Sequence, residues 1–375
     1  MSRRGIKSMK KVMLVFGTRP EAIKMCPLVK ELKARGNADV SVCSTGQHRE
    51  MLDGVLSIFG VCADYDMSVM RDKQDLFYVT ERVLLGMREI LSEKRPDIVL
   101  VHGDTSTAFA ASLACFYERV AVGHVEAGLR TYNSFSPYPE EFNRRAIAAL
   151  ASIHFAPTET ARENLLREGV ASDKVFVTGN TVVDALKFTV RRDYSHPLLE
   201  WAAEGRLILL TSHRRENLGE PMRNIFRAVR RVAQEFADVR VIYPVHPNPL
   251  VREAARAELG DCSRIKLTDP LDAIDFHNIL ARSFIVLTDS GGVQEEAVAL
   301  GKPVLVARDS TERGEGVASG GLKLVGTEES GVYRNIRLLL DDAKIYTAMS
   351  NAPNPYGDGF ACGRIADAVE LFRSI

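Results

Sequence analysis

The sequence contains no long apolar run. A membrane-spanning helix needs about 18 consecutive apolar residues, and no stretch of this chain approaches that length. The basic opening Met1–Lys11 leads into the short apolar run Val12–Phe16, which is too short for the core of a secretory signal. We therefore predict a cytoplasmic protein without a membrane partner.

Paired cysteines and metal-binding spacings are also missing. The six cysteines include no C-x-x-C pair, and the eight histidines show neither H-x-x-x-H nor H-E-x-x-H spacing. Scattered single thiols in a chain of this size are typical of a reducing compartment rather than of a disulfide framework. Because no cluster of Cys and His supports zinc, we predict no metal site.

Neither the charge balance nor the glycine motifs indicate a nucleic acid or a dinucleotide. Lys plus Arg and Asp plus Glu number 49 each, so no global field attracts a nucleic acid. The nearest match to G-x-G-x-x-G, Gly314–Ser319, lacks the third glycine, and both a Walker loop and G-x-S-x-G are absent. We predict no cofactor, and an anionic ligand held by local basic residues and helix ends.

What the chain does contain is two series of short, β-branched apolar runs separated by helical stretches. Its 375 residues suggest two domains. The first series is Val12–Phe16, Val40–Ser44, Ile98–Val101, Val120–Gly123, Ile153–Ala156 and Val175–Thr178. The second is Leu207–Thr211, Val239–Pro244, Ile265–Thr268, Ile285–Thr288, Val304–Val306 and Leu322–Val325. Strands separated by single helices predict parallel sheets, and therefore an α/β fold of two Rossmann-like, doubly wound domains.

The segment Thr181–Trp201 is our predicted interdomain linker, because an apolar helical stretch is followed there by charged residues and His196–Pro197. It separates an N-terminal domain, residues 1–185, from a C-terminal domain, residues 186–359. A short helix at Cys362–Ser374 closes the chain. Periodicity leaves open whether this helix packs on the second domain or crosses back to the first.

Acidic residues follow two neighbouring strands of the first domain. Asp104 comes just after Ile98–Val101 and Glu126 just after Val120–Gly123, so both carboxylates reach the same sheet edge. Glu140 and Glu141 follow after a Pro-rich turn, where they could simply be first-turn helix acids. A single strand-end acid is commonly a cap or a salt-bridge partner. Several on one edge favour acid–base chemistry.

Basic residues surround the turn after the first strand. Gly17–Thr18 is followed by Arg19, Pro20 and, one turn on, Lys24. Because Pro20 suits a first helical turn, Arg19 and Lys24 would flank a helix N-terminus that suits a phosphate or diphosphate. The alternative is a tight turn with two solvated cations.

The second domain also carries polar residues just past its strands. His213 and His246 each stand beyond a strand end, although a lone buried histidine is usually structural. After Ile285–Thr288, Ser290 can cap a helix, and Gly291–Gly292 let backbone amides approach a diphosphate. Glu296 could accept hydrogen bonds from two ribose hydroxyls, and Arg308–Arg313 offers another anion clamp. The alternative is an ordinary capped helix start.

These motifs resemble the non-hydrolysing UDP-N-acetylglucosamine 2-epimerase family of bacteria, in family order along nearly the whole chain. The matching stretches are GTRPEAIK at 17–24, TGQHREML at 45–52, HGDTSTA at 102–108, HVEAGLRT at 124–131, SPYPEEFNR at 136–144, PTET at 157–160, GN at 179–180, HRREN at 213–217, YPVHPNP at 243–249, DSGGVQEEA at 289–297, GKPVLV at 301–306 and TER at 311–313. The chain departs from the pattern at Gly314, where the family usually has proline, and at 318–321.

The resemblance implies a fold, a set of roles and an assembly. It implies a GT-B-like architecture with a cleft between the domains, a C-terminal helix that crosses back to the first domain, and a homodimer. The implied catalytic residues are Asp104, Glu126, Glu140 and His213. The implied nucleotide-sugar contacts are Arg19, Lys24, Leu271 (through its backbone), Phe276, Ser290, Gly291, Gly292, Glu296 and Arg313. An allosteric UDP-N-acetylglucosamine site is matched by Gln47, Arg214 and His246, whereas Glu50 and Lys73 stand where glutamine and arginine are common.

The resemblance therefore predicts reversible epimerisation at C2 between UDP-GlcNAc and UDP-ManNAc, with UDP as the leaving group and 2-acetamidoglucal as the intermediate. Three alternatives stay open at this point. A hydrolysing epimerase would release free ManNAc and UDP, and a GT-B glycosyltransferase would share the UDP site but use an acceptor. A nucleotide-sugar-binding regulator would bind without catalysis, because a fold alone does not decide function.

Overall fold

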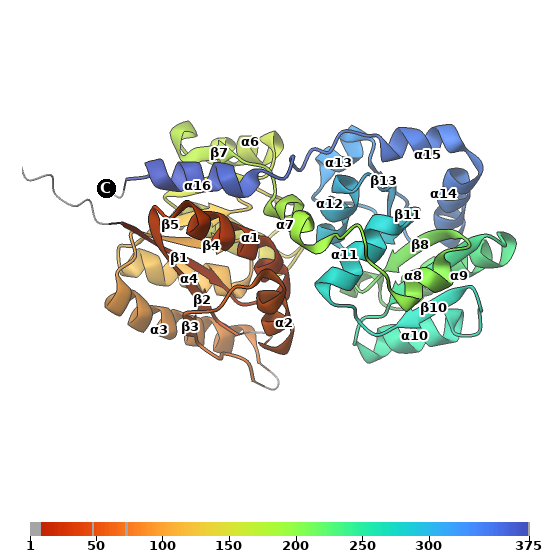
Figure 1. The fold of residues 1–375 in the computed structure, drawn as a ribbon, viewed down its shortest axis with the longest axis horizontal. Coiled ribbons are helices and arrows are strands. Elements are labelled where there is room, and N and C mark those ends of the chain that lie inside the picture. The colour runs from red at the N-terminus through yellow and green to blue at the C-terminus, as the bar shows by residue number, and fades with distance from the viewer. Residues whose placement is uncertain (1–8, 47–48, 72–73, 374–375) are drawn as a thin grey trace, which may run out of the picture. The chain divides into compact units, whose positions relative to one another are not determined.

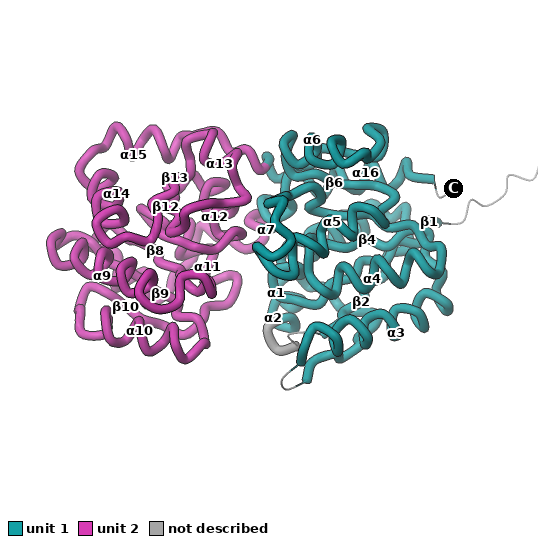
Figure 2. The backbone as a smooth tube through the Cα atoms, turned by 180° about the vertical axis from the view of Figure 1, so that it is seen from behind, with its two compact units in different colours: residues 1–185, 357–375 teal, residues 186–356 magenta. Residues whose placement is uncertain are grey.

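The computed structural model describes residues 9–46, 49–71 and 74–373. The chain divides into two compact units (Figure 2). Unit 1 comprises Met1–Ala185 and Gly357–Ile375, and unit 2 comprises Leu186–Tyr356. The sequence-based boundaries lay at 185/186 and 359/360. The first division falls inside helix α7 (Thr181–Thr189), where we expected the linker.

The sheet of unit 1 is parallel throughout the described strand pairs, with the order β3-β2-β1-β4-β5-β6-β7 (Figure 1). Its strands are β1 (Lys10–Phe16), β2 (Ala38–Ser44), β3 (Tyr65–Asp66), β4 (Ile98–His102), β5 (Ala121–Val125), β6 (Ile153–Ala156) and β7 (Val175–Val177). Residues 12–16 of β1 and all of β4 are buried. This burial on both faces explains their continuous apolar sequences.

Helices cover both faces of this sheet. They are α1 (Arg19–Arg35), α2 (Arg49–Phe59), α3 (Leu76–Lys94), α4 (Ser106–Tyr117), α5 (Glu140–Leu150), α6 (Glu159–Arg167), α7 and α16 (Ala361–Leu371), with a 3-10 turn at Ser172–Lys174. Helices α3 and α4 bury their apolar stripes against Met13, Val15 and Val99 of the sheet. Helices α2 and α16 pack beside α1.

The C-terminal helix α16 belongs to unit 1. The Asp184 carboxylate accepts hydrogen bonds from the first amides of the helix, Ala361 N at 3.1 Å and Cys362 N at 3.0 Å. Arg35 of α1 donates to Asp367 at 2.6 Å and to the backbone carbonyl of Gly363 at 3.0 Å. These contacts tie the last helix to the first helix of the same unit, and the helix ends at Leu371 rather than at Ser374.

Unit 2 repeats the architecture with a parallel sheet in the order β10-β9-β8-β11-β12-β13. Its strands are β8 (Arg206–Thr211), β9 (Val239–Pro244), β10 (Ile265–Thr268), β11 (Ile285–Thr288), β12 (Val304–Val306) and β13 (Leu322–Leu324). Its helices are α8 (Pro197–Ala202), α9 (Glu220–Glu235), α10 (Pro249–Leu259), α11 (Ala273–Arg282), α12 (Gly291–Ala299), α13 (Gly314–Ser319), α14 (Glu329–Asp341) and α15 (Ala343–Ser350), with a 3-10 turn at Arg215–Asn217. Helices α9, α10 and α14 share one apolar core with the sheet.

Each sheet reverses its strand order at one point. In unit 1 the reversal lies between β1 and β4, and in unit 2 it lies between β8 and β11. Ligands of open parallel sheets bind beyond the carboxyl ends of the strands at such a reversal. The residues that follow these four strands are therefore the natural candidates for function.

The predicted fold class, two doubly wound α/β units, is confirmed. Every expected strand is present, with ends that differ by at most two residues. The expected strand Val120–Gly123 extends to Val125, so His124 lies inside the sheet rather than beyond it. The short edge strand β3 was missed, because two residues carry no period. Within the described ranges, no helix is long and apolar enough to cross a membrane.

Gly128, in the loop after β5, is a residue whose replacement should strongly destabilise unit 1. Its φ is +91°, and an added Cβ would lie 2.1 Å from the carbonyl oxygen of Ala161 in α6. We expect Gly128→Ala to lower the free energy of unfolding by about 3 kcal/mol or more, from the clash and the left-handed backbone together. Chemical denaturation measures it.

Gly169→Ala is the matched control. Its φ of +88° is nearly the same, but an added Cβ there meets no atom within 4 Å. The left-handed backbone conformation alone should lower the free energy of unfolding by about 1–2 kcal/mol in this variant. Equal losses in the two variants would show that the contact with Ala161 is unimportant.

Candidate functional site

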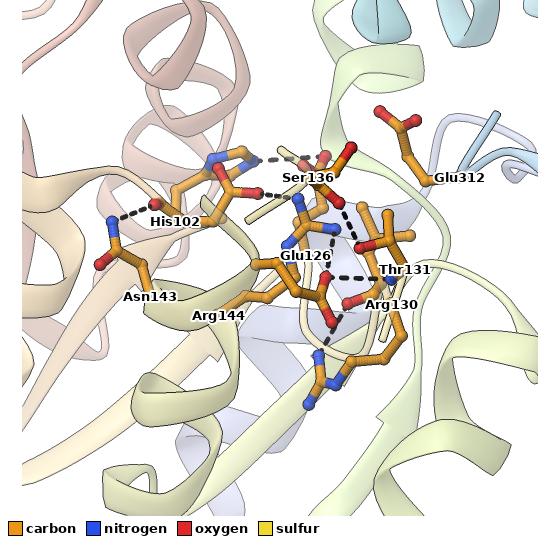
Figure 3. A network of polar contacts seen from close by, with 12 residues as sticks. His102, Glu126, Arg130, Thr131, Ser136, Asn143, Arg144 and Glu312 are labelled. Atoms are coloured by element: carbon orange, nitrogen blue, oxygen red, sulfur yellow. Dashed lines mark hydrogen bonds and ion pairs between the residues drawn. The ribbon is translucent and has the colours of Figure 1, made fainter. Parts of the chain in front are cut away.

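Glu126 is the centre of a buried polar cluster at the carboxyl edge of the unit 1 sheet. It directly follows β5 and has a φ of +62°, a left-handed conformation that non-glycine residues seldom adopt. Its Oε2 atom forms an ion pair with Lys24 Nζ and accepts a hydrogen bond from Asn180 Nδ2 at 2.7 Å. His102 Nε2 lies 3.6 Å from the same oxygen (Figure 3). Strained backbone and convergent polar groups are typical of functional positions.

Asp104 lies in the neighbouring turn, after β4. Its Oδ2 atom lies 2.7 Å from Arg144 Nη2, and its backbone carbonyl accepts from Asn143 Nδ2 at 2.9 Å. The side chain of Arg144 is only 4% exposed, whereas that of Asp104 is 26% exposed. The buried Arg144 guanidinium therefore pairs with the Asp104 carboxylate, while the Asp104 side chain stays partly exposed to solvent.

The two glutamates at the start of α5 differ in their surroundings. Glu141 is fully buried, and its carboxylate accepts hydrogen bonds from the amides of Thr131 and Tyr132, both at 3.0 Å. Thr131 Oγ1 in turn donates to the Ser136 carbonyl at 2.6 Å (Figure 3). Glu141 thus stabilises the loop that precedes α5 through hydrogen bonds to its backbone. Glu140, the predicted catalytic acid, is the first residue of α5 and is half-buried.

Arg19 and Lys24 lie in the first two turns of α1, as predicted. Thr18 and Glu21 form a reciprocal capping box at this helix start. Arg19 is half-buried beside the cap. Lys24 is buried and ion-paired with Glu126, so the structure joins a predicted diphosphate contact to a predicted catalytic carboxylate. The sequence contained no signal for that pairing.

In unit 2 the loop after β11 presents Ser290, Gly291 and Gly292 at the start of α12. Ser290 occupies the N-cap position, but its hydroxyl makes no capping bond, contrary to our expectation. Any Cβ on Gly291 would lie 2.9 Å from Cζ of Arg313. A larger residue would displace the Arg313 guanidinium, which packs directly against the helix start. A cation beside the N-terminus of this nine-residue helix suits an anion.

Arg313 is held by two buried carboxylates. Its Nε lies 3.0 Å from Glu295 Oε1, and its Nη1 lies 2.5 Å from Glu312 Oε1. Glu312 also contacts Arg308 at 3.1 Å and Arg214 at 3.8 Å. Burial raises the pKa of Glu312, but Arg313 and the other two arginines outweigh it and lower the pKa to about 2. Glu312 is thus an ionised centre among three arginines.

Glu296 lies in the second turn of α12 and is 9% exposed. Its Oε2 atom is 3.6 Å from Nε2 of the buried His277, whose Nδ1 bonds Thr189 Oγ1 at 2.7 Å. Phe276 stands beside His277 with a ring separation of 6.1 Å, and Leu271 is half-buried just before α11. Phe276 and His277 thus lie on α11, Glu296 lies on α12 beside His277, and Leu271 precedes α11.

His213 and His246, which follow β8 and β9, are brought together. Their rings stack with centroids 5.3 Å apart. Burial lowers the pKa of His213, Asp289 opposes that shift, and Arg214 adds to it. His213 is therefore neutral near pH 7 and able to accept a proton. Of the predicted allosteric residues, Arg214 and His246 both adjoin His213, whereas Gln47 lies outside the described residues.

Sequence reasoning gave no role to several residues that the structure places in these clusters. His102 and Asn180 contact Glu126, and Arg144 contacts Asp104. Each lies within or beside a matched motif, at or near the end of a strand or on α5. Their position was visible in the sequence, but their partners were not.

Comparison with known proteins supplies the family. The model of the family described as UDP-N-acetylglucosamine 2-epimerase matches residues 30–370. The chain is 58% identical to the UDP-N-acetylglucosamine 2-epimerase of Bacillus subtilis over 359 residues, 96% of this chain and 94% of that one.

Solved structures agree with that match. A putative UDP-N-acetylglucosamine 2-epimerase from Listeria monocytogenes superposes with a TM-score of 0.94 at 55% identity, over 96% of this chain and 95% of that one. The enzyme from Neisseria meningitidis bound to UDP-GlcNAc gives a TM-score of 0.91 at 45% identity, over 96% of this chain and all of that one.

Proposed function

Because this chain belongs to the UDP-N-acetylglucosamine 2-epimerase family, we propose that it interconverts UDP-GlcNAc and UDP-ManNAc without net hydrolysis. The observation that carries the proposal is the Glu126 carboxylate, which is set among Lys24, Asn180 and His102 at a strand end. A base beside a cation at this position suits proton removal from a sugar that is losing a diphosphate.

The chemistry explains why such residues are needed. The hydrogen on C2 is not next to a carbonyl, so direct deprotonation is slow. When the bond from C1 to the diphosphate oxygen breaks, the oxygen keeps the electron pair and C1 becomes positive. A base then takes the C2 proton, and the C1–C2 double bond of 2-acetamidoglucal forms. Protonation on the opposite face and return of UDP complete the epimerisation.

The proposed roles divide between cations and acid–base groups. Arg19, Lys24, Arg313 and the amides of residues 290–292 stabilise the departing diphosphate electrostatically. Asp104, Glu126, Glu140 and His213 transfer protons at the two faces of the ring. Phe276 and the backbone of Leu271 contact the uracil. We also propose that a second UDP-GlcNAc binds at Gln47, Arg214 and His246, and that the enzyme is a cytoplasmic homodimer.

The deciding experiment is proton NMR of UDP-GlcNAc with the pure protein in D₂O, without added NAD. We expect deuterium at C2 together with a growing UDP-ManNAc signal. Accumulation of free ManNAc and UDP would select the hydrolysing reaction. Tight UDP-GlcNAc binding without exchange, with or without added effector, would leave a transferase or a regulator.

Glu296 is the residue that we expect to bind the ribose hydroxyls. Glu296→Gln removes a charged acceptor, and hydrogen bonds to charged groups contribute about 1.5–3 kcal/mol, so UDP affinity should fall about 10- to 100-fold. Calorimetry with UDP measures the loss. With 2′,3′-dideoxy-UDP, which has no such hydroxyls, wild type and variant should bind equally. If the variant still bound 2′,3′-dideoxy-UDP more weakly than wild type, Glu296 would act on a part of UDP other than the ribose hydroxyls.

A further inference from the structure

Asp289, just past β11, is a buried carboxylate to which we have so far given no role. It is fully inaccessible to solvent. Its Oδ2 atom accepts hydrogen bonds from Ser212 Oγ at 3.0 Å, His213 N at 2.9 Å, Arg214 N at 3.0 Å and Asn217 Nδ2 at 3.0 Å. All four donors belong to one segment, Ser212–Asn217, which we call the His213 loop. One carboxylate oxygen thus accepts hydrogen bonds from four residues of this loop.

The strand register explains why Asp289 can reach this loop. Strands β8 and β11 are neighbours at the reversal of the unit 2 sheet, and Thr211 pairs with Thr288. The hydroxyls of these two threonines are hydrogen-bonded at 2.6 Å. Ser212 and Asp289 therefore leave the sheet side by side. Residues 290–292, which start α12, follow Asp289 directly.

The second carboxylate oxygen faces the imidazole of His213. Oδ1 lies 3.5 Å from His213 Nδ1 and accepts a second contact from the His213 amide at 3.1 Å. Arg214 also acts on this ring, and His246 stacks against it. Asp289 alone among these three brings negative charge, and it raises the pKa of His213 against the effects of burial and of Arg214.

We propose that Asp289 is the positioning residue of His213, holding the His213 loop in place and stabilising the imidazolium when His213 is protonated during epimerisation. The inference rests on the proposed function, because it gives His213 a proton-transfer role. The interaction resembles in kind the carboxylate–imidazole pair of other acid–base enzymes, where the carboxylate orients the ring and never reacts.

Asp289→Asn separates the two parts of this role. An asparagine carbonyl at the Oδ2 position can still accept from the four donors of the loop. Its amide group loses only the longer contact from the His213 amide and faces Nδ1 without negative charge. We expect UDP affinity within about threefold of wild type and kcat reduced about 100-fold, as small losses of catalytic geometry commonly produce. NMR titration of the His213 ring should show its pKa lowered by about 1, since a nearby opposite charge typically contributes that much.

Asp184→Asn is the matched control, because Asp184 is also a buried aspartate that accepts backbone amides, but at the start of α16. It should leave kcat and the His213 pKa unchanged. Wild-type kcat together with an unshifted His213 pKa in Asp289→Asn would overturn the inference. The NMR titration needs no substrate, so it decides the role of Asp289 even if wild type shows no exchange at C2, an outcome that would refute only the proposed function.

If Asp289→Asn does not fold, two milder variants carry the test. Ser212→Ala and Asn217→Ala each remove one donor to Oδ2 and leave the Asp289 charge in place. Both should lower kcat severalfold, with KM and the His213 pKa retained. Unchanged kcat in both variants would refute the claim that catalysis depends on the hydrogen bonds between Asp289 and the His213 loop.

Discussion

Glu126→Gln should slow exchange at C2 by about 10³-fold while leaving UDP binding intact. Glutamine keeps the shape of the side chain and can accept the hydrogen bonds of Lys24 and Asn180, but it cannot take a proton. General acid–base catalysis contributes about 10²- to 10⁴-fold, so we expect the rate of deuterium incorporation from D₂O to fall by about 10³-fold. The measurement is the decay of the C2 proton signal by NMR.

The Lys24 ammonium gives this variant a second readout. In wild type it is ion-paired with Glu126, and in Glu126→Gln it loses its carboxylate. Its full charge is then available to the diphosphate, so UDP affinity measured by calorimetry should be equal to wild type or tighter. A fall in affinity together with retained exchange would mean that Glu126 serves the ligand site through Lys24 and not as a base.

Glu168→Gln is the control for the Glu126 variant. Glu168 also forms a carboxylate–cation pair in unit 1, with Arg130 at 2.7 Å, but it lies next to α6 rather than at a strand end. This variant should lose some stability and keep its exchange rate. If both glutamines lowered exchange to the same extent, general weakening of unit 1 would explain the result.

Asp104→Asn should reduce exchange about 10²- to 10³-fold and destabilise unit 1 modestly. The change removes the carboxylate charge that faces the buried guanidinium of Arg144. The asparagine carbonyl can still accept a hydrogen bond from that guanidinium. Glu141 stays 3.5 Å from Arg144, so we expect a loss of only about 1–2 kcal/mol in the free energy of unfolding. Denaturation and NMR exchange measure the two effects separately.

The pH dependence of kcat distinguishes proton transfer by Asp104 from a purely structural role in which Asp104 only pairs with Arg144. If Asp104 transfers a proton, Asp104→Asn removes one ionisation from the profile. Arg144→Lys keeps a cation beside Asp104 but cannot form the same contacts to two carboxylates. It should lower kcat and retain both limbs of the profile. Identical profiles in the two variants would assign Asp104 a structural role.

The sequence alone was sufficient for the fold class and for most element positions. Buried parallel strands such as β1 and β4 are continuous apolar runs, so their limits are visible in one dimension. The resemblance to the family, now confirmed by the match over residues 30–370, rested on motifs that are contiguous in the chain. Edge strand β3 was missed because two residues contain no pattern.

The sequence could not show which side chains contact one another in the folded protein. His124 and His213 both stand near strand ends, but His124 is fully buried in β5, where its Nε2 contacts the Gly103 carbonyl at 2.7 Å. Burial lowers the pKa of His124 to about 3, so it stays neutral. His213 instead stacks on His246 and faces Asp289. Only folding separates a core histidine from a candidate acid–base group.

The sequence by itself determined which residue types stand beyond the strands, because local periodicity places strand ends and parallel crossovers bring those ends to one edge. Only the tertiary structure decided which charges meet. Lys24 and Glu126 are 102 positions apart, and Asp289 lies 76 positions from His213. Their contacts follow from strand order and register, which place β1, β4 and β5 in succession in unit 1 and β8 beside β11 in unit 2. A linear pattern carries no record of that order.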